Sequence, residues 1–208
     1  MNADEFVEAV RSGNETALSR LGSSKSLYAD TRGEMEPDAV LRAAADAEHA
    51  AAETFAAWAD GEDGAAGEAF AATAEEERDH YERVAAKLDD HEPSGDASAM
   101  QAHLRGLDGT VERLGGLVGR TLVAGKSKEQ TTGFFVGQAD PRTAGLFREL
   151  GDDLDGQLER ATDALAEECS DDEDWERALD AASGTVQTAY EAYTERLESM
   201  GVNPKPVC

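Results

Sequence analysis

The sequence predicts an all-α protein. Alanine, glutamate, aspartate, leucine and arginine dominate the 208 residues, aromatic residues make up 6% of the chain, and β-branched runs are almost absent. Ala, Leu, Glu and Arg favour helices, whereas strands are enriched in β-branched and aromatic residues. Apolar residues also recur at intervals of three and four, which is the spacing on the buried face of a helix. We therefore expect helices that pack against helices.

The chain carries a net charge of −26, from 45 acidic and 19 basic residues. This excess leaves no basic face for nucleic acid, so we expect no DNA or RNA partner. Such acidity, with only five lysines, is typical of a halophilic protein in a salt-loaded cytoplasm. Disorder is the alternative meaning of this composition, and the sustained helical spacing argues against it. Without a long apolar run or a signal peptide, we expect a soluble, cytoplasmic protein that has no membrane partner.

The helical spacing divides the chain into three segments, which we expect to pack as one domain: residues 1–36, 37–170 and 171–208. The first holds a short amphipathic helix, interrupted near Asn14, and a loop from Ser23 to Met35. The last holds a helix over residues 174–200 and a tail. These flank the middle segment as additional N-terminal and C-terminal elements.

The middle segment begins with two helices joined by a Gly-rich turn at 61–64. Pro37 suits the first turn of the first helix, which we expect to end at Asp60. The second helix is expected from about Ala65 to Asp89. Both helices are long enough to form an antiparallel pair.

The connection to the second half, residues 91–97, is too short to recross a bundle. A helix over 98–118 would be about 30 Å long and could make the return. The third core helix, 122–136, would then run parallel to the second, and a fourth would follow at 147–170. This is the order of a four-helix bundle with one crossover helix.

Ionisable side chains occupy apolar positions in the first helix pair. Glu48 lies in the three-and-four stripe of the first helix, and Glu77 and His80 lie in that of the second. A buried charge is costly unless it is paired or bound to a metal. The spacing therefore predicts that these three side chains point toward one another, either as metal ligands or as a hydrogen-bonded network.

The segments that carry these residues, AEHAAAETF at 47–55 and FAATAEEERDHY at 70–81, resemble the ferritin-like superfamily, in particular its rubrerythrin-like branch without a rubredoxin domain. The resemblance covers residues 38–90 well, and the second half shares only the helical pattern. It implies a ferritin-like four-helix bundle that binds iron through a Glu from each of two helices and a Glu-x-x-His from each of the other two.

Carried onto this chain, the resemblance implies metal ligands at Glu48, Glu77, His80 and Glu129. The second Glu-x-x-His is degenerate, because Leu154 and Gln157 stand at its ligand positions. The metal would be iron, in a mononuclear or dinuclear site, with manganese, zinc or no metal as alternatives.

Two functions from different classes follow. The first is a non-haem iron oxidoreductase of peroxidase type that reduces peroxide or oxygen, with catalytic residues that the sequence does not specify. The second is a non-catalytic helical scaffold or interaction protein on a degenerate bundle. Dimers are common for such bundles, so a homodimer is the assembly to test first. Cys169 and Cys208 are expected to be free thiols.

Overall fold

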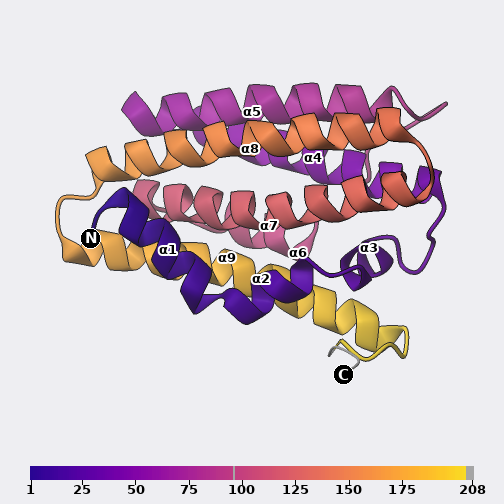
Figure 1. Ribbon diagram of the computed structural model, residues 1–208. Coiled ribbons are helices and arrows are strands. Elements are labelled where there is room, and N and C mark those ends of the chain that lie inside the picture. The colour runs from indigo at the N-terminus through magenta and orange to yellow at the C-terminus, as the bar shows by residue number, and fades with distance from the viewer. Residues whose placement is uncertain (96, 205–208) are drawn as a thin grey trace.

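The computed structural model describes residues 1–95 and 97–204 of the chain. Within these ranges the protein is all-α, as predicted, with nine helices and no strand (Figure 1). The helices are α1 (Ala3–Gly13), α2 (Glu15–Leu21), α3 (Lys25–Asp30), α4 (Pro37–Ala59), α5 (Gly64–Ala85), α6 (Ala99–Arg105), α7 (Thr110–Gly137), α8 (Pro141–Glu168) and α9 (Asp172–Ser199).

The ends of the long helices follow local chemistry. Pro37 and Pro141 open α4 and α8, where a missing backbone N–H costs nothing. Asp140 caps α8, because its side chain accepts hydrogen bonds from the backbone N–H groups of Arg142 and Thr143. Asn14, which separates α1 from α2, is buried and donates to the Val10 carbonyl. The predicted interruption near Asn14 is therefore confirmed.

Two sequence expectations are wrong. Residues 23–35 are not one loop, because they contain the short helix α3. The expected crossover helix over 98–118 does not exist as one element: α6 ends at Arg105, and α7 then runs without interruption from Thr110 to Gly137. At the break, Gly106 ends α6, and Gly109, in an extended conformation, precedes the first turn of α7.

The glycines of α7 permit close packing rather than ending the helix. A Cβ on Gly115 would lie 2.3 Å from the carbonyl oxygen of Ala178, and one on Gly119 would lie 2.4 Å from that of Ala182. Both carbonyls belong to α9, so only glycine lets the two helices approach this closely. The packing of α9 thus explains why this stretch of α7 carries glycine.

Four long helices form the frame around the candidate site. Helices α4 and α5 pack as one hairpin, and α7 and α8 as another. Arg160 pairs with Glu76, and Glu149 with Arg83, so α5 and α8 run antiparallel. Because α7 and α8 also form a hairpin, α7 runs parallel to α5. In Figure 1, α9 lies on the other side of α7 from α4, α5 and α8, with α1 and α2 in front of it.

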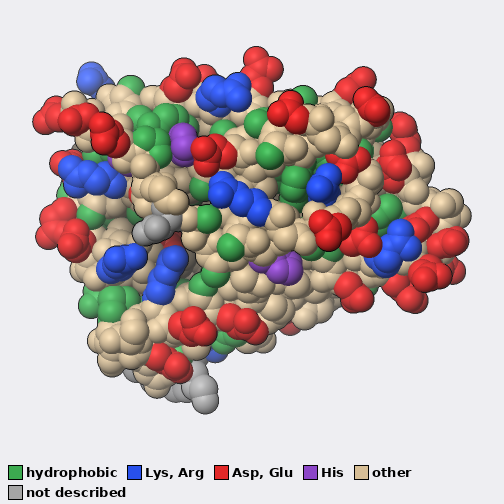
Figure 2. All heavy atoms as spheres, turned by 180° about the vertical axis from the view of Figure 1, so that it is seen from behind, with side chains coloured by type: hydrophobic (Ala, Val, Ile, Leu, Met, Phe, Trp, Pro, Cys, Tyr) green, Lys and Arg blue, Asp and Glu red, His purple; other side chains and the backbone are tan. Residues whose placement is uncertain are grey.

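The core follows this arrangement. The largest buried cluster includes Phe55, Trp58 and Phe70 from the first hairpin, together with Leu114 from α7 and Trp175 from α9. Acidic side chains spread over the surface and outnumber lysine and arginine on the face shown in Figure 2. Among the described residues, no helix is both long and apolar enough to cross a membrane.

Candidate functional site

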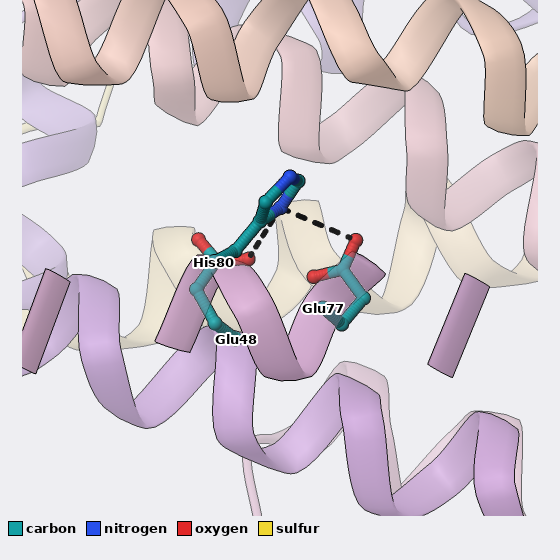
Figure 3. A group of neighbouring side chains, drawn as sticks. All are labelled: Glu48, Glu77 and His80. Atoms are coloured by element: carbon teal, nitrogen blue, oxygen red, sulfur yellow. Dashed lines mark ion pairs between the residues drawn. The ribbon is translucent and has the colours of Figure 1, made fainter. Parts of the chain in front are cut away.

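The structure brings Glu48, Glu77 and His80 together between α4 and α5, as the helical spacing predicts (Figure 3). All three are buried. His80 Nδ1 lies 3.9 Å from Glu48 Oε2 and 3.9 Å from Glu77 Oε1. One ligand atom from each residue lies within 4.8 Å of the others, so this group could hold a metal ion.

Glu129 does not join the group. Its side chain is exposed and pairs with Lys126 on the same helix, at 3.0 Å between Nζ and Oε2. The residue that α7 turns inward is its neighbour Lys128, which is buried and donates a hydrogen bond to Glu48 Oε1. Adjacent residues lie about 100° apart around a helix, so a shift of one position exchanges an inward carboxylate for an inward ammonium.

A second buried cation faces the other carboxylate. Arg120 of α7 makes a two-pronged contact with Glu77: Nη1 donates to Oε1 at 2.6 Å and Nη2 to Oε2 at 2.7 Å. Its Nη2 also lies 3.6 Å from Glu48 Oε2. Planar guanidinium–carboxylate pairs of this kind are among the strongest and most specific ion pairs in proteins.

Helix α8 supplies the remaining partners. Gln157, which is fully buried, donates from Nε2 to Glu77 Oε1 at 2.7 Å. His80 Nε2 lies 3.0 Å from Asp153 Oδ2. In the neutral ring, a proton on Nε2 would donate to Asp153 and leave Nδ1 as an acceptor that faces the two glutamates. Leu154 is buried and offers no ligand atom.

Burial and charge set the protonation of the site. Burial raises the pKa of Glu48, although Lys128 opposes this. Burial also favours the neutral form of Glu77, but the Arg120 guanidinium outweighs it and holds the pKa of Glu77 well below its usual range. For Arg120, desolvation is outweighed by Glu77, which raises the pKa of the guanidinium. At their formal charges, the two carboxylates balance the two cations in this buried network.

Two buried polar atoms of the site make no hydrogen bond to the described residues. They are Glu48 Oε2 and His80 Nδ1, and they face each other across 3.9 Å. Buried polar atoms without a hydrogen bond cost free energy. Arg120 Nη2 lies 3.6 Å from Glu48 Oε2, which is within ion-pair distance but too far for a hydrogen bond.

Sequence reasoning missed Arg120, Lys128 and Asp153. Aligning the helix ends at Asp60 and Asp140 sets Lys128 opposite Glu48, since each lies twelve residues before its helix end. The signal for Lys128 was therefore present in the sequence. Arg120 and Asp153 gave no such signal, because Asp153 is half-exposed and neither lies on the apolar stripe of its helix.

No family profile, curated protein or solved structure matches the chain.

The two cysteines are the other groups that the sequence analysis singled out. Cys169 caps the end of α8 and is half-buried, and burial raises the pKa of its thiol to about 11. Cys208 falls outside the described residues.

Proposed function

We propose that this protein is a non-catalytic, metal-independent helical scaffold built on a degenerate ferritin-like bundle. One observation carries the proposal: both carboxylates of the candidate metal site already pair with cations of the same chain. Glu48 pairs with Lys128, and Glu77 pairs with Arg120. The charge of the site is balanced without an ion, so these residues do not fit a two-metal centre.

The order of the helices supports the ferritin-like part of this proposal. Two helical hairpins, α4–α5 and α7–α8, are joined by a long connection, and α7 runs parallel to α5. The Glu-x-x-His of α5 faces the single glutamate of α4, as the resemblance implies. The proposed scaffold does not carry out rubrerythrin-like iron chemistry.

In a scaffold, the buried ions would fix the register of the helices. Buried ion pairs often add little net stability over apolar residues of similar size, but each partner needs its own counterpart in place. A slide of α7 by one turn would move Arg120 away from Glu77 by about 5.4 Å. We infer that the network selects one arrangement of α7 against the first hairpin.

A mononuclear metal site is the second candidate, and one observation favours it. Glu48 Oε2 and His80 Nδ1 are buried, face each other and make no hydrogen bond to the described residues, and Asp153 orients the imidazole ring. Hydrogen bonding of a ligating histidine to a carboxylate is usual at metal sites. Iron, manganese or zinc could suit this donor set, and bound iron would supply redox chemistry toward peroxide or oxygen.

Metal binding by the purified protein distinguishes the two candidates. The scaffold proposal expects no saturable binding of Fe(II) under anaerobic conditions, or of Mn(II) or Zn(II), at micromolar concentration. It also expects that a chelator leaves the thermal unfolding temperature unchanged. Saturable binding of one ion per chain that disappears in Glu48→Gln would support the second candidate instead.

A further inference from the structure

A cleft of about 340 Å³ lies between α4 and α9, over the stretch of α7 that carries the ion network. This volume is within the range of small-molecule sites. Small side chains line much of both walls; they are Ala43, Ala44, Ala47 and Ala50 of α4, and Ala189 and Ala192 of α9. Larger apolar side chains at these positions would fill the space, so the cleft is open because these positions carry alanine.

The floor of the cleft contains buried hydrogen-bond donors. Lys128 and Arg120 contribute to it, and each is more than nine-tenths buried. An ammonium group has three N–H donors, and among the described residues Lys128 donates only to Glu48. A buried donor without a partner costs free energy, so an acceptor in the cleft would stabilise the folded chain.

Gln101 adds a second polar group to the same cleft. It is 2% exposed, and its amide lies 2.8 Å from the hydroxyl oxygen of Thr54, which also contacts the Ala50 carbonyl at 2.8 Å. The other polar atom of the amide has no partner in the described chain. The cleft therefore presents two buried groups with unused hydrogen-bonding capacity.

The charges at the floor restrict what could bind. At their formal charges, Glu48 and Glu77 balance Lys128 and Arg120 at the floor, and elsewhere in the lining Arg196 pairs with Asp30. A ligand that brought a whole charge into this floor would leave that charge unpaired in a low-dielectric environment. An uncharged acceptor, such as a carbonyl or amide oxygen, avoids this penalty.

The walls favour an apolar body on such a ligand. Apart from the alanines, the lining includes large apolar side chains from five helices; they are Leu27, Val40, Val123, Phe147 and Tyr193. We propose that the cleft binds a small, uncharged amphiphile. Its carbonyl oxygen accepts from Lys128, the amide of Gln101 makes the second polar contact, and its apolar part lies against these walls.

Three small-molecule probes that share a six-carbon chain and differ in the head group test the preference for an uncharged head group: hexanamide, hexanoate and hexylammonium. Ligand-observed NMR titration of the full chain at high salt gives the dissociation constant of each probe. We expect saturable binding of hexanamide, at least about tenfold tighter than that of either charged probe, since a difference of 1.4 kcal/mol corresponds to tenfold.

Variants test the location. Ala44→Phe, at a half-buried lining position of α4, should fill the cleft and abolish hexanamide binding, whereas Ala71→Phe, on the exposed face of α5, should not change it. Gln101→Leu should weaken binding about fivefold, the loss expected for one hydrogen bond. The proposal is overturned if hexanamide does not saturate, if a charged probe binds as tightly, or if Ala44→Phe and Ala71→Phe bind alike.

Discussion

Replacing Lys128 by methionine tests the ion network directly. The substitution keeps a long apolar side chain but leaves the Glu48 carboxylate in the core without its closest cation. Removing one partner of a buried pair typically costs about 3–5 kcal/mol. Arg120 lies 3.6 Å from the other oxygen of Glu48 and offsets part of this loss. We therefore expect a loss near the lower end, about 3 kcal/mol at neutral pH.

Protonation of Glu48 sets an upper limit to this loss. At pH 7, protonating a glutamate whose unfolded pKa is about 4.3 costs about 3.7 kcal/mol, because each pH unit contributes about 1.36 kcal/mol. The same limit is about 1 kcal/mol at pH 5. Since burial raises the pKa of Glu48 in the folded chain, the folded state takes up a proton as the pH falls. The penalty of Lys128→Met should therefore shrink toward pH 5.

Urea unfolding followed by circular dichroism at high salt measures the free energy of unfolding. Lys126→Met is the matched control, since Lys126 makes an exposed pair on the same helix and should cost less than about 1 kcal/mol. The double variant Glu48→Leu with Lys128→Met should recover most of the loss. The reasoning is refuted if Lys128→Met costs no more than Lys126→Met, or if the double variant is no more stable than the single one.

The remaining predictions concern packing, acid and salt. Gly119→Ala should be strongly destabilising, because its Cβ would lie 2.4 Å from the Ala182 carbonyl oxygen. Gly133→Ala, with open space around it, should instead stabilise α7 by about 1 kcal/mol. Thermal unfolding of both variants checks this, and equal effects on the unfolding temperature would contradict it. The free energy of unfolding should fall as the pH drops below about 4, because the pKa of Glu77 is lowered in the folded chain, so that Glu77 takes up a proton in the unfolded chain at a higher pH than in the folded one. Urea unfolding midpoints measured across this pH range would show the fall, and Glu77→Gln should make it less steep. Because the net charge is −26, transfer from molar to low salt should lower the unfolding temperature, which calorimetry measures; a temperature independent of salt would contradict it.

The first hairpin could be predicted from the sequence because its signals are local. Pro37 marks the start of α4, and the turn after Asp60 separates it from α5. The spacing of Glu48, Glu77 and His80 with apolar residues then fixes which way they face. Each of these inferences needs only one helix and the rule that stripes pack inward.

The second half could not be predicted equally well, because its determinants lie in other helices. Glycine is a poor helix former, and only the approach of α9 to Gly115 and Gly119 explains why α7 continues through them. A shift of one position along α7 decides whether Lys128 or its neighbour Glu129 points toward the site. Acidic residues are also so common that Asp153 does not stand out from its neighbours.

We propose that the cations of α7 take the place of a metal at Glu48, Glu77 and His80. Elemental analysis of the protein, purified without chelator, tests it most directly when metal content is expressed per chain. We predict that iron, manganese and zinc are all far below one equivalent, and that the value does not change in Glu48→Gln. One equivalent or more of a single metal, lost in Glu48→Gln, would contradict the account.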